Sequence, residues 1–324
     1  MSTVTHLYSY ASDHMPIVLQ TRSYHKQRQI RKRSFKFEES WLMWEECEEV
    51  VSEAWHANGN NEVGLVSVRE KIKHCGSDLM AWGISKADQN NEEIKKLQKQ
   101  LEILTETETT EGTKAKYFEV GKRLDDLLLK QEIYWAQRSR IPWLKYGDKN
   151  TKYFHSKASQ KRRNHINGIQ NGEGLWVEDM EDIVNVAAGY FDNLFYAGSC
   201  DQMKECIDAI PSKVTPEMQH MLSSDFTAEE VEVALFQMGP TKAPEPDGMN
   251  ALFYQKFWHV VGEFVTMALI DFLNLGNMVP NINHTNIVLI PKVKNLEKMF
   301  DFRPISLCNV IYKIISKVLA NRPK

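Results

Sequence analysis

Cysteine is scarce in the sequence, and its spacing suggests no metal site. The 324 residues include five cysteines, at positions 47, 75, 200, 206 and 308, and no Cys-x-x-Cys pair. An odd, scattered set of thiols is typical of a reducing compartment and argues against a zinc site. We therefore expect reduced cysteines that pack as small hydrophobic side chains.

Long hydrophobic runs are missing too. No run approaches the roughly 20 apolar residues that a membrane-spanning helix needs, and no signal peptide opens the chain. Hydrophobic residues make up 42% of the chain and charged residues 26%, as in folded soluble proteins. The sequence thus predicts a protein of the nucleus or cytoplasm, neither secreted nor bound to a membrane, with two or three domains.

The net charge is only −3, but it conceals two segments in which cations are concentrated. The first covers residues 22–36, which contain seven Lys or Arg and no acid. Such a run suits nucleic acid or a nuclear-import receptor, and it is equally typical of a solvated linker between domains.

The second basic segment covers residues 145–163 and combines cations with aromatic rings. It holds seven Lys or Arg against one acid. Single-stranded nucleic acid favours this combination, because phosphates bind cations and bases stack on flat rings. We predict nucleic-acid contact here, against the alternative of a solvated helix with Tyr153 and Phe154 in its core. The contacting residues would be Lys145, Lys149, Lys152, Tyr153, Lys157, Lys161, Arg162 and Arg163.

Near the N-terminus, Asp13 and His14 lie in a polar turn that precedes a strand-like run. A histidine in such a place can act as the general base of a phosphodiesterase. The alternative is an exposed turn histidine with no chemical role.

The pattern from residue 35 to residue 140 is helical. Residues 35–56 predict one acidic amphipathic helix whose tryptophans belong to a core rather than to a stacking surface. Two long helices follow, joined by a polar tip at Thr105–Thr113, and they predict a helical hairpin. Asp125 and Asp126 fall inside the second helix, so we interpret them as surface carboxylates.

The remaining third alternates short strands with helices. Residues 166–177 predict a small β-hairpin, and Asp179 and Thr227 are expected to cap helices. Residues 200–219 read as a loop, and Met249 to Trp258 as an aromatic helix. His284 to Ile290 predicts a strand with Lys292 at its tip. Arg303 is expected on a turn stiffened by Pro304, and two such cations suit a polyanion.

Several motifs in this region resemble one known family. They are Lys-Ala-Pro-x-Pro-Asp-Gly at 242–248, Ile-Pro-Lys at 290–292, Arg-Pro-Ile-Ser-Leu-Cys-Asn at 303–309, and the run from Tyr312 to Arg322. Together they resemble the first blocks of the reverse transcriptases of plant LINE-type, non-LTR retrotransposons. Residues 135–155 are similar to the linker ahead of these enzymes. Ser-Asp-His-x-Pro-Ile, around His14, is similar to the end of their endonuclease.

The resemblance implies an RNA-directed DNA polymerase with a right-hand fold, of which these blocks form the fingers. Lys292 and Arg303 would contact the triphosphate of the incoming nucleotide, and template RNA would be the ligand of the second basic segment. Asp13 and His14 would be remnants of the endonuclease site. The family has glycine where this chain has Glu245, a carboxylate that would repel phosphate.

Polymerases of this kind use two metal ions held by carboxylates, and the intact family enzyme uses Mg²⁺. We find no such carboxylate motif in this sequence and expect no cofactor, no metal site and no polymerase activity from it alone. The expected fold is α+β and mainly helical. Residues 1–20 would be an endonuclease remnant, 21–225 a helical linker region, and 226–324 the fingers of a polymerase whose palm is missing. The alternatives are a non-catalytic RNA- or DNA-binding helical protein, and a relic with unstable fingers.

Overall fold

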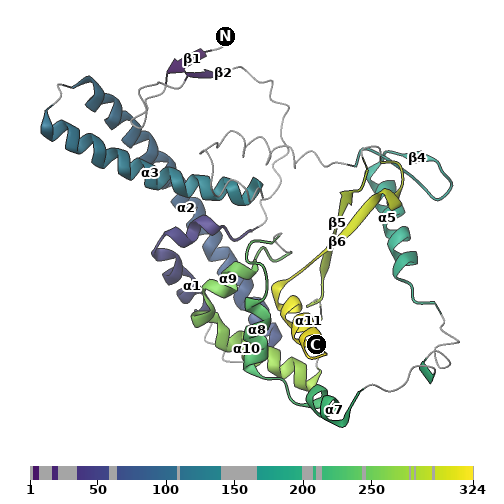
Figure 1. Ribbon diagram of the computed structural model, residues 1–324. Helices are drawn as coiled ribbons and strands as arrows, with labels where there is room; N and C mark the ends of the chain where they lie inside the picture. Colours follow the sequence, from purple (N-terminus) through teal and green to yellow (C-terminus); the bar gives the residue numbers. More distant parts are fainter. Residues whose placement is uncertain are drawn as a thin grey trace. The chain divides into compact units, whose positions relative to one another are not determined.

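The computed structural model describes most of the chain (Figure 1). The described residues are 3–6, 17–20, 35–57, 64–107, 110–139, 166–198, 207–208, 214–242, 246–276, 279–280, 282–293 and 296–323. They are mainly helical, with short antiparallel strands in small two-stranded sheets, which agrees with the predicted α+β class. The chain divides into two compact units, residues 1–59 with 71–159 and residues 60–70 with 160–324. Each is described by itself.

A helical hairpin dominates the first unit. Its two helices are α2 (Leu65–Glu106), of which the part from Lys71 on belongs to this unit, and α3 (Glu111–Ser139). Apolar side chains of both helices form one buried cluster: Ile94, Leu97, Leu101, Val120, Leu124 and Leu127. The predicted hairpin is confirmed. Asp125 and Asp126 lie within α3, as expected.

The segment expected to form one helix over residues 35–56 is broken. A 3₁₀ helix, η1 (Glu39–Met43), is followed by an extended residue, Trp44, and then by α1 (Glu46–His56). The break follows from packing. The ring of Trp41 lies edge-on to Phe37 and Trp82, and the ring of Trp44 lies 3.3 Å from the ammonium of Lys130. The two rings thus contact different partners on either side of the break.

The cysteines of this unit match the expectation from the sequence. Cys47 on α1 and Cys75 on α2 are free thiols with almost no exposed surface. Burial raises the pKa of both thiols to about 12, so they stay protonated and unreactive at neutral pH. A short antiparallel pair, β1 (Thr3–His6) with β2 (Ile17–Gln20), also belongs to this unit.

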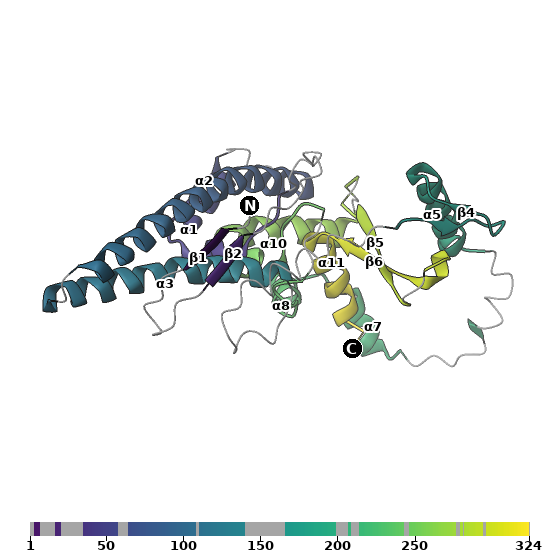
Figure 2. The ribbon, with the colours of Figure 1, turned by 90° about the horizontal axis from the view of Figure 1, so that it is seen from above.

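Two clusters of elements make up the second unit. The first combines the hairpin of β3 (Ile169–Gln170) and β4 (Trp176–Val177) with helix α5 (Met180–Phe195). The second contains α7 (Pro216–Ser223), α8 (Ala228–Phe236), α9 (Ala251–Lys256), α10 (Trp258–Leu275) and α11 (Val310–Asn321). Strands β5 (Thr285–Pro291) and β6 (Phe302–Cys308) lie side by side, with the short 3₁₀ helix η3 (Met299–Asp301) before β6 (Figure 2).

The helices α8, α10 and α11 pack together around a fully buried core. It includes Val231, Ala234, Leu235, Val261, Val265, Leu269, Ile311 and Ile314. By length and composition alone α10 would suffice to cross a membrane, and its residues Val261, Val265 and Leu269 are buried in this core.

Two expectations for this unit were wrong in detail. Part of the presumed loop at 200–219 begins α7, because the Thr215 hydroxyl accepts a hydrogen bond from the Met218 N–H and Pro216 occupies the first turn, where proline is tolerated. The aromatic helix expected from Met249 to Trp258 is interrupted at Phe257, where α9 ends and α10 begins.

Candidate functional site

The hairpin formed by β5 and β6 carries both cations that the sequence predicts as nucleotide contacts. Its register runs from Thr285 opposite Cys308 to Pro291 opposite Phe302, and it pairs Ile290 with Arg303. Beyond the last pair, the Lys292 N–H donates to the Asp301 carbonyl oxygen at 2.8 Å. Opposed residues share a sheet face and side chains alternate along a strand. Lys292 and Arg303 are therefore placed on the same face, at the same end of the hairpin.

Arg303 lies in strand β6 and not on a turn, so that expectation is corrected. The reason is that Pro304, opposite Leu289, is compatible with a strand here. Each strand of a two-stranded sheet is an edge, and proline is tolerated where no neighbour needs its missing N–H. The guanidinium of Arg303 is exposed and has no hydrogen bond or ion pair within the described part of the chain.

Lys292 is held in place by residues 296–301, the segment that leads the chain back into β6 and is called here the return segment. Its ammonium donates to the Phe300 carbonyl oxygen at 2.7 Å and lies 4.3 Å from the centroid of the Phe300 ring. That ring is 70% exposed. Phe300 is thus a flat surface beside a cation, a combination suited to bases and phosphates. Phe300 could not be predicted from the sequence as part of the site, because only the folded return segment brings its ring to Lys292.

Asp301 has a structural role in the same return segment, directly before β6. Its carboxylate accepts hydrogen bonds from the backbone N–H groups of Lys298, at 2.9 Å, and Glu297, at 3.1 Å. These two bonds hold the pKa of Asp301 below its usual value. The carboxylate therefore fixes the backbone that leads into β6.

The loop before α9 contains an unusual carboxyl group, Asp247. Burial raises its pKa to about 6, although a hydrogen bond from the Met249 N–H (3.0 Å) and the charge of Lys313 act in the opposite direction. The next residue, Gly248, has a φ of 78°, which favours glycine. Glu245, where the chain departs from the pattern that the motifs resemble, lies outside the described residues.

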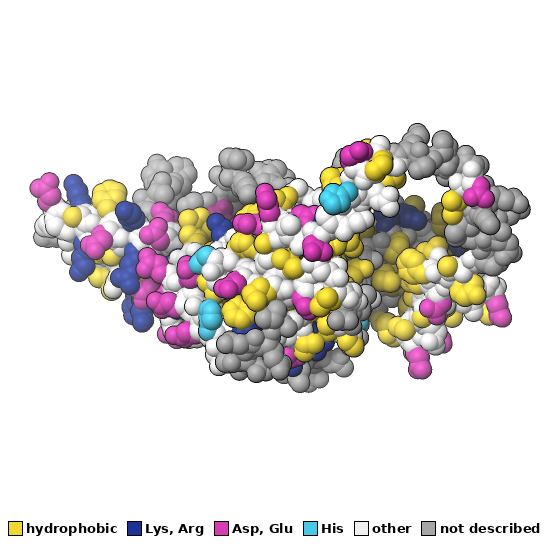
Figure 3. Space-filling model, turned by 90° about the horizontal axis from the view of Figure 1, so that it is seen from below, with side chains coloured by type: hydrophobic (Ala, Val, Ile, Leu, Met, Phe, Trp, Pro, Cys, Tyr) yellow, Lys and Arg dark blue, Asp and Glu magenta, His cyan; other side chains and the backbone are white. Residues whose placement is uncertain are grey.

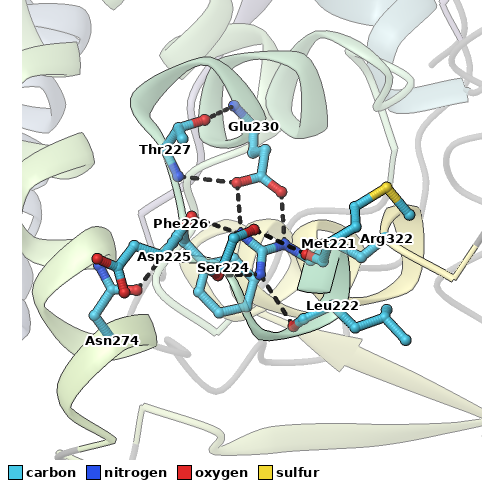
Figure 4. A network of polar contacts seen from close by, with 9 residues as sticks. All are labelled: Met221, Leu222, Ser224, Asp225, Phe226, Thr227, Glu230, Asn274 and Arg322. Atoms are coloured by element: carbon cyan, nitrogen blue, oxygen red, sulfur yellow. Dashed lines mark hydrogen bonds and ion pairs between the residues drawn. The ribbon is translucent and has the colours of Figure 1, made fainter. Parts of the chain in front are cut away.

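One guanidinium holds the end of α11 against α7 and α8 (Figure 4). Arg322 donates to the carbonyl oxygens of Leu222 (3.3 Å), Ser224 (2.5 Å) and Asp225 (2.9 Å), and its plane lies 3.5 Å from the Phe226 ring centroid. At the other end of the helix, the Asn309 carboxamide caps the Tyr312 N–H and donates to the Ile282 carbonyl oxygen. Helix α11 and the base of the β5–β6 hairpin are therefore tied together.

Other predicted site residues cannot be placed. Asp13, His14 and the whole basic segment at 145–163 lie outside the described residues, and so do residues 22–34 of the first basic segment. Within the described part of the chain, no three His, Cys, Asp or Glu side chains are grouped so that they could hold a metal ion. The structure thus places two of the predicted contacts, Lys292 and Arg303, at the same end of one hairpin.

Comparison with known proteins gives one informative relative. No known protein-family profile matches the chain. Over 246 residues it is 27% identical to the transposon TX1 uncharacterized 149 kDa protein of Xenopus laevis. The aligned region covers 74% of this chain and 19% of that protein, so the chain spans about a fifth of its relative. The chain is similar to a transposon-encoded protein, which supports the predicted relation to a transposable element.

Proposed function

We propose that this chain is part of a reverse transcriptase-related polypeptide of a LINE-type, non-LTR retrotransposon, of the class found in plants. The similarity to a transposon protein supports the relation, and the motifs from residue 242 to residue 322 support the enzyme class. In this proposal residues 226–324 form the fingers of the polymerase, residues 21–225 the linker region, and residues 1–20 the end of an endonuclease.

The β5–β6 hairpin is the proposed nucleotide-binding element. The observation that carries the proposal is its register, which places Lys292 and Arg303 on one face. Both side chains are exposed. A triphosphate bound there would accept charge-assisted hydrogen bonds from the guanidinium and the ammonium, and its base would stack on Phe300.

The proposed function is binding, not bond formation. Nucleotidyl transfer needs carboxylates that hold two metal ions, and we assign that role to none of the residues described above. In our proposal the basic segment at 145–163 binds template RNA, and the hairpin binds nucleotide. Purified protein is expected to show no templated, magnesium-dependent primer extension, and extension above background would contradict this part of the proposal.

A fluorescent deoxynucleoside triphosphate, titrated with the purified chain, tests the nucleotide site. We expect Lys292→Ala and Arg303→Ala each to weaken binding about tenfold, because each removes one charge-assisted hydrogen bond of roughly 1.5 kcal/mol. Lys256→Ala is the matched control, since Lys256 is exposed on α9. Equal loss in all three variants, or no loss in the first two, would overturn the assignment.

A further inference from the structure

Helix α5 has two apolar sides, and only one of them is covered by other described residues of its unit. Its N-terminus is capped by the Asp179 carboxylate, which accepts a hydrogen bond from the Glu181 N–H at 3.0 Å. Ile183, together with Val186, Ala187 and Tyr190, packs against Ile169 of β3 and against Met299 and Phe302 at the end of the β5–β6 hairpin. This side of the helix accounts for its attachment.

The second apolar side is adjacent to the first and stays exposed. Val184 and Phe195 are 56% and 65% exposed, and Met180 is 54% exposed. They follow helical spacing along the whole length of α5 with the exposed Ala188 and the half-buried Phe191, which also packs against the covered side and stacks on Phe195 at 5.8 Å. Hydrophobic side chains beside acidic ones are visible in the right-hand part of the space-filling view (Figure 3). Monomeric proteins rarely expose a continuous apolar surface of this kind without a partner for it.

The charged residues of the segment that carries this surface are all acidic. Residues 166–198 contain six Asp or Glu and no Lys, Arg or His. Glu181 and Asp192 are exposed and follow the apolar side around the helix. The cations of the neighbouring elements, Lys292, Lys298 and Arg303, belong to the end of the β5–β6 hairpin, which packs on the Ile183 side. The exposed side therefore combines large apolar groups with an acidic border.

We propose that this side of α5, defined by Met180, Val184, Ala188, Phe191 and Phe195 and called here the α5 surface, docks an amphipathic helix of a partner protein whose apolar stripe is bordered by Lys and Arg. Apolar residues at helical spacing match a second helix, which places its side chains between those of the first. The acidic border selects a basic partner and repels nucleic acid and anionic lipid. This inference is independent of the proposed polymerase relation.

Fluorescence anisotropy of a labelled synthetic peptide tests the proposal. The probe is an 18-residue helix with leucines on one face and lysines on both sides of it. Its two controls are a peptide with the lysines replaced by glutamates, and a scrambled peptide of the same composition without an apolar stripe. We expect the lysine-bordered helix to bind at least tenfold more tightly than either control.

Variants of exposed residues locate the binding. Phe195→Ala removes the largest apolar group, and Asp192→Lys reverses one charge near the C-terminus of the helix, where a cation is compatible with helix formation. We expect each to weaken peptide binding about fivefold to tenfold, whereas Glu232→Lys, an equal charge reversal on α8, has no effect. Equal binding of the three peptides, or equal affinity of all variants, would overturn the proposal. A dimer of the protein that Phe195→Ala dissociates would also overturn it, because the α5 surface would then be covered by a second copy.

Discussion

Arg322 and Glu230 form a two-pronged ion pair that joins the end of α11 to the first turn of α8. The Nε and Nη2 groups of Arg322 donate to Oε1 and Oε2 of Glu230 at 2.7 and 3.0 Å. The arginine side chain is 8% exposed and the glutamate side chain 31%. Glu230 also accepts a hydrogen bond from the Thr227 N–H and so completes the capping box of α8. The two residues are 92 positions apart in the sequence.

Replacing Arg322 by alanine should strongly destabilise the second unit. The change removes the ion pair and the donor to three solvent-exposed carbonyl oxygens of residues 222–225, which we expect to cost roughly 1–3 kcal/mol. Urea unfolding gives the loss of stability, and hydrogen exchange gives the release of α7. Arg322→Lys should recover only part of it, because an ammonium cannot bind a carboxylate in the two-pronged manner.

The control for Arg322 is Arg69→Ala. Arg69 is exposed and donates one hydrogen bond, to the Pro280 carbonyl oxygen at 3.2 Å. We expect a change within about 0.5 kcal/mol. If Arg322→Ala were no more destabilising than this control, the ion pair would not be what holds α11.

Asp247 should make the second unit less stable as pH rises. Its folded pKa of about 6 lies above the ordinary value of 3.8, so the folded state binds this proton more tightly than the unfolded state. The contribution is therefore most favourable below about pH 4, falls as pH rises to about 6, and stays constant above it. The full difference is roughly 1–3 kcal/mol.

Asp247→Asn removes this dependence and retains an oxygen to accept the Met249 N–H. The variant should gain stability over the wild type between pH 4.5 and pH 7.5 in urea unfolding, and the gain should level off above pH 6. Because the two proteins differ at one side chain only, the other titratable groups contribute equally to both. Asp271→Asn, at an exposed position of α10, is the control. A constant difference between wild type and Asp247→Asn at every pH would contradict the raised pKa.

Replacing two helical glycines by alanine should change the stability of the protein in opposite directions. A Cβ at Gly83 on α2 would lie 2.5 Å from the nearest ring carbon of Trp41, whereas a Cβ at Gly189 on α5 meets nothing within 4 Å. Gly189→Ala should stabilise by about 0.5–1 kcal/mol through helix propensity. Gly83→Ala should destabilise by roughly 1–3 kcal/mol, because the ring is packed and cannot withdraw. Thermal unfolding of the two variants measures both changes. Stabilisation by Gly83→Ala would show that the Trp41 ring is not packed against Gly83.

Changing Lys161, Arg162 and Arg163 together to alanine should weaken RNA binding and its salt dependence. Each lost phosphate contact lowers the slope of log affinity against log salt by about 0.7 for a single strand, so we expect a decrease of about 2. Anisotropy with a labelled single-stranded RNA at several salt concentrations measures it. The matched control changes three exposed lysines of α2, Lys95, Lys96 and Lys99, and so removes the same charge. Equal slopes of log affinity against log salt in both triple variants would indicate only a general effect of net charge. That result would contradict RNA contact by residues 161–163.

Features fixed by neighbouring residues could be predicted from the sequence. The caps at Asp179 and Thr227 are confirmed, because a cap needs only a side chain and an N–H two or three residues later. The helical hairpin and the β3–β4 hairpin are also confirmed, because apolar periodicity and a tight turn are local signals. The mainly helical α+β class follows from the same signals.

The errors arose where distant contacts decide the backbone. The first helical segment ends at Trp44, whose ring packs against the ammonium of Lys130, a residue far away in the sequence. Arg303 belongs to a strand because β5 pairs with it, although the adjacent proline suggested a turn. The three-part division into domains stays a prediction, as do the roles of Asp13, His14 and the basic segment at 145–163.

The sequence by itself determined the helical periods, the caps and the motifs that resemble a reverse transcriptase, because each depends on residues within a few positions of one another. Only the tertiary structure decided that Lys292 and Arg303 share a sheet face, that Phe300 lies beside the lysine, and that Arg322 binds Glu230. It also left one apolar side of α5 exposed. The physical reason is that register and packing bring together side chains whose separation along the chain carries no local signal.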